Sequence, residues 1–221
     1  MSKKSPNPTK KPSLSQVRII AGEYRRRLVS FIDADGLRPT PDRVRETLFN
    51  WLADSLPNSR VLDCCAGSGA LGFEAVSRGA SHVTLIEANR EQFLQLQRTQ
   101  QQLAIPSNRL TCLHGKAEQL IPQLSPLTPT TLSTIEDNSR NATNRTAFDV
   151  IFLDPPYALE LWQPILQALS KQGLMDSETL IYIEANQPHA DVLGEFSAQL
   201  HPIKDKKIGQ IYIALYHIND L

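Results

Sequence analysis

From residue 60 onward, short apolar runs alternate with longer segments in which apolar residues recur every three or four positions. The short runs predict buried strands, and the longer segments predict amphipathic helices. The expected strands are residues 60–63, 82–86, 109–113, 148–153 and 179–183. The expected helices are residues 70–78, 90–103, 117–124 and 159–171, followed by a weaker one from Ala190. This alternation is typical of a parallel sheet covered by helices.

Hairpin patterns flank this region. Residues 17–31 predict one hairpin with Gly22 near its turn, and residues 202–217 predict another with Gly209 in or near its turn. The second hairpin adds an antiparallel pair to the parallel strands. We therefore expect an α/β fold with a mixed sheet.

The stretch between the first hairpin and the first core strand predicts a helix start. Thr40 is the expected N-cap and Pro41 the expected first helical residue. These patterns divide the chain into an N-terminal extension of hairpin and helix at residues 17–57 and a core at residues 58–221.

Two segments lack any such periodicity. Residues 1–16 are rich in Lys, Pro and Ser, which predicts a disordered basic tail. In residues 125–146, 14 of 22 positions are Ser, Thr, Asn or Pro, which favours a mobile insertion.

Composition narrows the class of protein. The 221 residues are 41% hydrophobic and 21% charged, which suits one globular domain. There is no apolar run of about 18 residues and no signal-peptide pattern, so we expect neither a membrane helix nor secretion. The three cysteines include no Cys-x-x-Cys pair, and the histidines lack metal-ligand spacing. These features favour a cytoplasmic protein that binds no metal.

The net charge of zero hides a strong asymmetry. Residues 1–45 contain 11 Lys and Arg against 4 Asp and Glu, whereas the rest of the chain contains 12 against 19. This distribution favours a polyanion-binding face at the N-terminal end, with a solvated basic tail as the alternative. The arginines that could form the face are Arg18, Arg25, Arg26, Arg27, Arg38, Arg43 and Arg45. Pairing of Arg43 and Arg45 with acids in the same helix is a further alternative.

A glycine-rich loop follows the first core strand, which ends at Asp63. Its glycines have Gly-x-Gly-x-x-Gly spacing and are Gly67, Gly69 and Gly72. This spacing brings backbone close to a ligand at a helix N-terminus. Glu87 ends the next strand, where an acid binds both hydroxyls of a ribose. An acid at the strand tip repels a pyrophosphate and attracts a cationic ligand, which favours S-adenosylmethionine over NAD.

The expected strand at residues 148–153 runs directly into Asp154-Pro155-Pro156-Tyr157. Ligands of a parallel sheet lie outside the carboxyl ends of its strands, so this tetrapeptide should lie beside the glycine loop. Its groups suit methyl transfer to an exocyclic amine on a planar ring. The Asp154 carboxylate and the Pro155 carbonyl would accept the two amine N–H groups, and Tyr157 would stack on the ring. A structural Pro-Pro turn is the alternative.

With both motifs in place, the chain resembles the amino-directed S-adenosylmethionine-dependent methyltransferases. More closely, it is similar to the bacterial family that methylates guanine N2 in 16S ribosomal RNA. The matching stretches are residues 17–22, 37–52, 66–72, 154–157 and 209–210. The stretch at residues 37–52 is the specific one, because the glycine loop and the tetrapeptide belong to a much wider superfamily.

The resemblance implies a Rossmann-like, seven-stranded mixed sheet of the class I methyltransferase type. The cofactor-binding residues it implies are Asp63, Ala66, Gly67, Gly69, Glu87, Ala117 and Asp154. Asp154, Pro155 and Tyr157 would act on the guanine. RNA contacts would come from Arg18, Arg25, Arg26, Arg27, Arg38 and Arg43, on a basic face next to the site. The expected partner is 16S ribosomal RNA or an assembling small ribosomal subunit, and we expect a monomer.

Other interpretations stay open. A DNA-adenine or protein-glutamine methyltransferase could share the tetrapeptide, although no target-recognition domain is evident. An NAD-dependent oxidoreductase would need a catalytic set of Lys, Tyr and His that the sequence does not reveal. A non-catalytic RNA-binding module would keep the basic face and transfer no methyl group.

Overall fold

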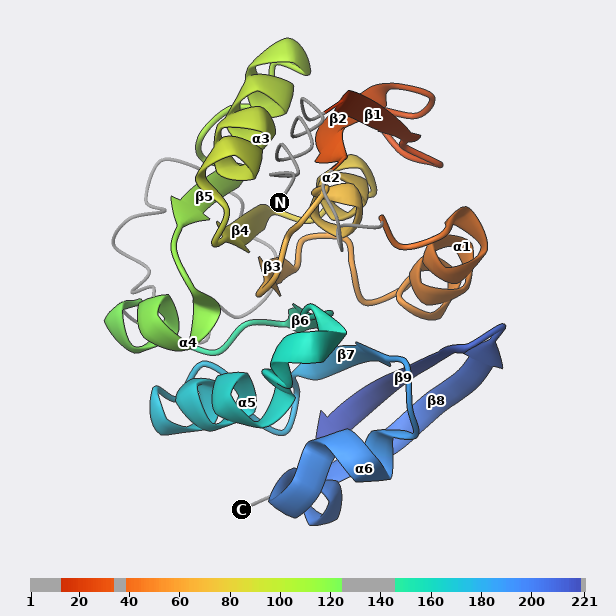
Figure 1. Ribbon diagram of the computed structural model, residues 1–221, viewed down its shortest axis with the longest axis vertical. Helices are drawn as coiled ribbons and strands as arrows, with labels where there is room; N and C mark the ends of the chain where they lie inside the picture. The colour runs from red at the N-terminus through yellow and green to blue at the C-terminus, as the bar shows by residue number, and fades with distance from the viewer. Residues whose placement is uncertain (1–12, 34–38, 125–145, 220–221) are drawn as a thin grey trace, which may run out of the picture.

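The computed structural model describes residues 13–33, 39–124 and 146–219, and a mixed sheet forms its centre (Figure 1). The parallel strands are β3 (Arg60–Asp63), β4 (His82–Glu87), β5 (Leu110–His114), β6 (Val150–Leu153) and β7 (Leu180–Ala185). A closing hairpin consists of β8 (Leu200–Ile208) and β9 (Ile211–Ile218). Its strand β9 pairs antiparallel with β7, which gives the order β5-β4-β3-β6-β7-β9-β8. The expected seven-stranded mixed sheet is confirmed.

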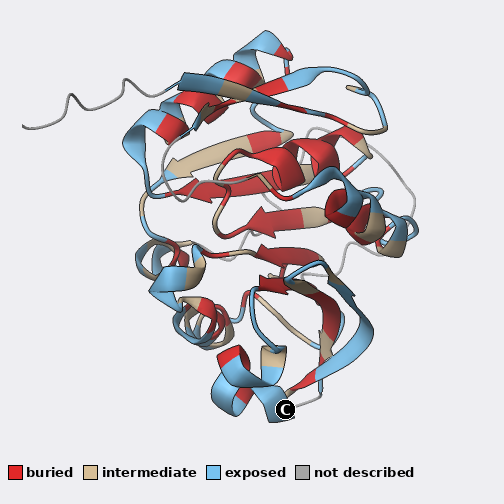
Figure 2. Ribbon diagram, turned by 45° about the vertical axis from the view of Figure 1, so that its right-hand side comes forward, coloured by how far each residue is buried: buried red, intermediate tan, exposed pale blue. Residues whose placement is uncertain are grey.

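Helices cover both faces of this sheet (Figure 1). One face carries α1 (Asp42–Trp51), α2 (Ala70–Ser77) and α3 (Arg90–Gln102), and the other carries α4 (Ala117–Leu120), α5 (Trp162–Lys171) and α6 (His189–Leu193). Successive strand residues alternate between two apolar cores, as Val61 and Leu62 of β3 do. Figure 2 shows the central strands buried between the two helical layers. Burial on both faces explains why these strands are continuous apolar runs in the sequence.

Several element boundaries agree closely with the sequence. β3 has the expected bounds, and α3 begins at Arg90, where the Asn89 side chain caps it by accepting the Gln92 amide at 3.0 Å. α5 begins at Trp162, later than the expected 159, because Tyr157–Leu159 form a separate 3-10 turn.

The N-terminal hairpin, β1 (Ser13–Arg18) and β2 (Leu28–Asp33), forms its own two-stranded sheet. The expected disordered tail is therefore wrong for residues 13–16, which pair with residues 30–33. Most of these four side chains are exposed, so the sequence shows no alternation of apolar and polar residues there. Residues 1–12 lie outside the described part of the chain, as do Arg38 and all of the expected insertion except Thr146.

The turn of this hairpin lies against the last residue of α2. The Glu23 amide donates to the Ser77 carbonyl at 2.8 Å, and the Tyr24 amide donates to the Ser77 hydroxyl at 2.9 Å. Gly22 has a φ of +84°, and a Cβ there would overlap the Ser77 carbonyl oxygen. Glycine is required at this position by both its dihedral angle and its space.

The first helix begins differently from expectation. α1 starts at Asp42 with Pro41 as its N-cap, and no side chain caps it. The N-cap prediction for Thr40 is wrong, because its hydroxyl has a partner in another part of the chain. Arg45 also departs from the expected basic face, since it is fully buried and pairs with Asp42 at 2.7 Å. The intrahelical alternative holds for this arginine.

A buried carboxylate on α2, that of Glu74, ties the extension to the core. It accepts the backbone amides of Ile20 at 2.7 Å and Ala21 at 3.0 Å. It also pairs with Arg78 at 2.6 Å and lies 3.7 Å from Arg45. Hairpin, first helix and core helix therefore meet at one fully buried side chain.

We expect Glu74→Ala to lower the free energy of unfolding by about 3 kcal/mol. Two buried amides would lose their acceptor, and Arg45 would keep only the exposed Asp42 as a partner. Urea unfolding measures the change, with Glu46→Ala on the exposed face of α1 as the control. Equal midpoints for the two variants would contradict this account of Glu74.

Candidate active site

Three segments meet at the carboxyl edge of the parallel strands. β3 lies between β4 and β6, and Asp63 is in register with Leu85 and Phe152. The Cys64 amide donates to the Phe152 carbonyl at 3.1 Å, so the chain leaving β3 lies beside the end of β6. The glycine loop, the end of β4 and the tetrapeptide are thus neighbours, as the sequence predicts.

The glycine loop is fastened to the end of β4. The Gly67 amide donates to Glu87 Oε2 at 2.8 Å, and the Asn89 amide donates to Glu87 Oε1 at 2.6 Å. Gly67 and Gly69 have φ values of +49° and +77°, which favour glycine. Gly69 is the N-cap of α2, so the loop leads directly into a helix N-terminus. This is the geometry in which backbone amides approach a ligand.

Asp63 is a buried acid with an incomplete set of partners. Burial raises its pKa to about 7, and the nearby Glu87 charge adds to the rise, whereas the amides of Cys65 and Gly72 oppose it. Its Oδ2 atom has no hydrogen-bond partner in the described structure. A buried carboxylate oxygen of this kind needs a donor or a cation.

Asp154 leads the tetrapeptide and binds a residue of the extension. The Thr40 hydroxyl donates to Asp154 Oδ2 at 3.3 Å, across 114 positions of sequence. Burial raises the pKa of Asp154 well above its ordinary value, and the charges of Glu184 and Asp63 raise it further. Sequence reasoning placed Thr40 at a helix start and therefore missed its contact with the site.

Tyr157 is held by two residues that sequence reasoning also missed. Its hydroxyl donates to Glu184 Oε1 at 3.1 Å, and its ring stacks on Trp162 with a centroid distance of 6.2 Å and an interplanar angle of 18°. Glu184 lies within an apolar strand, and Trp162 fits an ordinary core position at a helix start. No spacing in the sequence marks either as part of the site.

The acids of the site indicate which kind of cofactor it can bind. Asp63, Glu87 and Asp154 have no ion-pair partner in the described ranges, and burial raises the pKa of each. Such a donor set fits a ligand that carries positive charge, as the sulfonium and ammonium of S-adenosylmethionine do, and it disfavours a pyrophosphate. Ala66 and Ala117 are buried next to these segments, and Ala117 begins α4 at the same edge. Within the described residues, no cluster of three or more His, Cys, Asp or Glu could hold a metal ion.

The arginines of the hairpin turn are not next to this site. Arg109, just before β5, pairs with Glu23 at 2.7 Å, and the turn also contacts the last residue of α2. Both contacts lie at the amino ends of the parallel strands, one length of α2, about 12 Å, from the glycine loop. The expected single basic face is therefore wrong in placing Arg25, Arg26 and Arg27 beside the tetrapeptide. Arg18 is paired with Leu28 close to the same turn.

Basic residues at the site edge come instead from two other elements. Arg43 is exposed in the first turn of α1, three residues after Thr40. The edge strand β8 exposes three lysines, Lys204, Lys206 and Lys207. Because β9 runs antiparallel to β7, Lys206 lies in one row with Ile213 and Glu184. The backbone of Lys206 is thus about 10 Å from that of Glu184, two strand spacings across the sheet.

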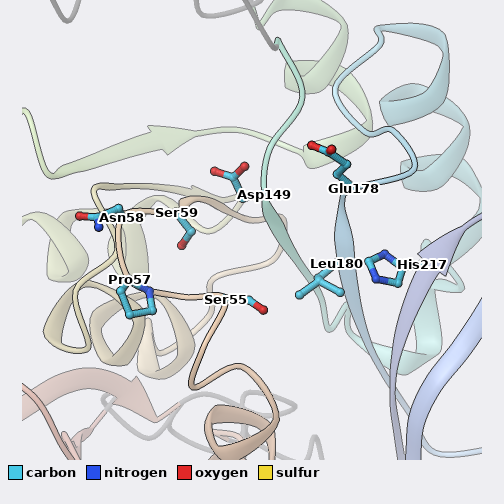
Figure 3. A pocket seen from close by; sticks show the side chains of 8 residues that line it. All are labelled: Ser55, Pro57, Asn58, Ser59, Asp149, Glu178, Leu180 and His217. Carbon is cyan, nitrogen blue, oxygen red and sulfur yellow. The ribbon is translucent and has the colours of Figure 1, made fainter. Parts of the chain in front are cut away.

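A cavity of about 390 Å³ lies at the opposite edge of the sheet (Figure 3). Its lining comes from the amino ends of β3, β6 and β7 and from the end of β9. The lining residues are Ser55, Pro57, Asn58, Ser59, Asp149, Glu178, Leu180 and His217. Its position separates it from the three carboxylates, so it is not the candidate active site.

The strand order, the glycine loop after β3 and the tetrapeptide after β6 define a Rossmann-like fold of the class I methyltransferases. Residues 17–217 match the family model described as Conserved hypothetical protein 95. The chain therefore belongs to that family, and the family resemblance seen in the sequence is confirmed. No helix among the described residues has the length and apolar character that crossing a membrane requires.

Individual relatives agree with this assignment. The chain is 36% identical over 212 residues to ribosomal RNA small subunit methyltransferase D of Escherichia coli strain K12, covering 94% of each protein. It is 34% identical over 201 residues to the protein of the same name from Haemophilus influenzae, covering 91% of this chain and 93% of that one. A solved Escherichia coli structure assigned as a methyltransferase shares 34% identity with a TM-score of 0.74. The alignment covers 94% of this chain and 100% of the solved one.

We expect the affinity for S-adenosylmethionine to increase as the pH rises through about 7, because Asp63 then loses its proton and attracts the cation. Isothermal titration calorimetry from about pH 6 to about pH 8 measures this dependence. Asp63→Asn should bind more weakly with a shallower pH dependence, whereas Asp191→Asn on the exposed side of α6 should match the unmodified protein. An identical slope in Asp63→Asn would remove Asp63 from cofactor binding.

Proposed function

We propose that this protein transfers a methyl group from S-adenosylmethionine to the exocyclic N2 amine of a guanine in 16S ribosomal RNA. The observation that supports the proposal is that the end of β6, which leads into Asp154, lies beside the chain that leaves β3 for the glycine loop, at one edge of the sheet. The Escherichia coli and Haemophilus influenzae relatives are named as methyltransferases of small-subunit ribosomal RNA, which supports the substrate class. A cytoplasmic location and a monomeric state remain part of the proposal.

When bound, S-adenosylmethionine supplies an electrophilic methyl group. Asp63 would hold the positive charge of its methionine part, and the Gly67–Gly69 turn would lie against that part, with the Gly67 amide already donated to Glu87 and the Gly69 amide to the Ala66 carbonyl. Glu87 already accepts two backbone amides, and an ionised carboxylate has lone pairs left for the two ribose hydroxyls. The backbone at Ala117 would border the adenine. These groups would orient the donor for in-line transfer.

The tetrapeptide prepares the accepting nitrogen. The lone pair of a guanine amine is delocalised into the ring, so the nitrogen is a poor nucleophile. Asp154 and the Pro155 carbonyl would accept its two N–H groups and draw it toward tetrahedral geometry. The Thr40 hydroxyl donates to Asp154 Oδ2 and so leaves the other oxygen for the amine. The raised pKa of Asp154 makes its carboxylate a better acceptor for the proton that the nitrogen loses.

We expect Asp154→Ala to lower turnover by about a hundredfold or more, with a modest change in cofactor affinity, because the variant loses an acceptor for the target amine. Methyl transfer to a small-subunit RNA substrate gives the rate, and calorimetry gives the affinity. Asp54→Asn is the control, since that side chain is exposed between α1 and β3, next to Ser55 of the cavity at the opposite edge of the sheet. Unchanged turnover in Asp154→Ala would refute its role.

The substrate itself is tested in cells. Nucleoside mass spectrometry of ribosomal RNA from a deletion strain should show the loss of one N2-methylguanine, restored by the unmodified gene and not by Asp154→Ala. Loss of a methylated adenine instead, or no loss from RNA, would overturn the proposed substrate.

We further propose that β8 contacts the phosphate backbone of the RNA beside the site. All three of its lysines are exposed, and the alternative role of such lysines is to protect an edge strand from pairing. Lys207 is ordered by the Tyr212 hydroxyl at 2.7 Å and by the Tyr212 ring at 4.3 Å. Arg43 would add a contact from α1. Arg18 and the hairpin turn would contact RNA that extends past the far edge of the sheet.

We expect Lys204→Ala, Lys206→Ala and Lys207→Ala combined to weaken binding of a short RNA stem-loop and to reduce its salt dependence. Three lost phosphate contacts correspond to a slope smaller by about 2 to 3 in a plot of log affinity against log salt. The matched variant removes the same charge through Arg25→Ala, Arg26→Ala and Arg27→Ala, and should change the slope less. An unaltered slope in the lysine variant would remove β8 from the RNA interface.

A further inference from the structure

Glu184 is a buried acid whose carboxylate binds two tyrosines. Oε1 accepts the Tyr157 hydroxyl at 3.1 Å, and Oε2 accepts the Tyr182 hydroxyl at 2.7 Å. The residue is 3% exposed and has no Lys or Arg partner in the described ranges. Burying an acid without a Lys or Arg partner lowers the stability of the fold. The contacts that Glu184 makes therefore indicate its role.

The same residue also holds the neighbour on which Tyr157 lies. Trp162 donates its indole Nε1–H to the Glu184 backbone carbonyl at 3.0 Å, and Trp162 and Tyr157 are stacked. Glu184 therefore fixes both rings of the stack, one through its side chain and one through its backbone. Trp162 is buried, whereas Tyr157 is partly exposed in a short 3-10 turn after two prolines.

The position of Tyr157 needs such a constraint. The backbone hydrogen bonds of its turn run from the Leu159 amide to the Pro156 carbonyl and from the Glu160 amide to the Tyr157 carbonyl, so neither holds the ring. The Glu184 hydrogen bond is what ties the ring to the sheet. A phenol with one fixed oxygen and one stacked face has a defined ring plane. Since Asp154 lies three residues earlier in the same tetrapeptide, this plane also sets where a base would lie relative to Asp154.

We propose that Glu184 is a positioning residue of the methyl-transfer site, which orients the ring of Tyr157 and through it the target base. The inference rests on the proposed function, because it assigns Tyr157 as the stacking surface. A purely structural role of Glu184 in anchoring Tyr182 within β7 is the competing explanation. The two roles differ in whether the Tyr157 hydroxyl matters.

Tyr157→Phe and Glu184→Gln test the shared hydrogen bond. The first keeps the ring and removes the hydroxyl. The second keeps the size of the side chain, but it puts an NH2 donor where one of the two acceptor oxygens was, so one of the two phenols can no longer donate to it. We expect each variant to lower kcat about tenfold with an unchanged KM for S-adenosylmethionine, because the base is misplaced while the cofactor loop is intact.

The double variant is decisive. Both substitutions act on the same hydrogen bond, the one between the Tyr157 hydroxyl and Glu184. The double variant Tyr157→Phe/Glu184→Gln should therefore be no slower than the slower single variant. Rates that multiply, or full activity of Tyr157→Phe, would overturn the positioning role. Glu195→Gln, exposed in the segment Gly194–Ala198, is the matched control for the loss of one acid.

Thermal unfolding and the guanine-methylation assay distinguish a misfolded variant, a wrong proposed function and a wrong positioning role. If Glu184→Gln fails to fold in thermal unfolding, Tyr157→Phe alone carries the test, because its hydroxyl is at the edge of the core. If the unmodified protein methylates no guanine in ribosomal RNA, the proposed function fails. If it does so and Tyr157→Phe retains its kcat, the positioning role alone fails.

Discussion

The carboxylate of Glu74 is the contact on which the assembled site depends. It lies on α2, whose first turn continues the glycine loop and whose last turn supports the hairpin. By accepting the amides of Ile20 and Ala21 and facing Arg45, it fixes both parts of the extension on the core. The extension in turn brings Thr40 to Asp154. One helix therefore connects the cofactor loop to the segment that completes the tetrapeptide site.

Buried acids give the site its electrostatic character. Burial raises the pKa values of Asp63, Glu87, Asp154 and Glu184, and neighbouring charges raise those of Asp63 and Asp154 further. Their partners are backbone amides and hydroxyls, and no Lys or Arg pairs with them among the described residues, so the charged forms are left without a compensating cation. A cationic donor lowers the energy of this arrangement when it binds. The same carboxylates that cost stability in the folded protein thus favour the cofactor.

Local sequence signals predicted what depends on local interactions. The bounds of β3, the Asn89 cap and the alternation of strands and helices follow from burial and capping, which act within a few residues. The juxtaposition of the two motifs also followed, because parallel strands bring their carboxyl ends to one edge. Roles for Asp63, Glu87 and the tetrapeptide are predictions that the geometry supports and that experiments must test.

The sequence predictions that were wrong concern residues whose contacts come from distant parts of the chain. Thr40 satisfies the local rule for an N-cap, but Asp154 provides its partner. Residues 13–16 look like a tail because their strand pairs on an exposed face. The arginines of the turn are close in sequence to the specific segment at residues 37–52, yet the direction of α2 carries them to the other edge. No sequence pattern marked Glu184 as part of the site, because the contacts of an acid within an apolar strand are visible only in the folded protein.

Gly22 shows that substitutions far from the active site can also abolish activity. Its backbone lies directly on the Ser77 carbonyl, so any side chain there would wedge the hairpin away from α2. The residue has no functional group and lies near the edge opposite the carboxylates. A screen of random variants for lost activity would nevertheless return this glycine alongside the acids, and its defect would be cured by lowering the temperature rather than by adding cofactor.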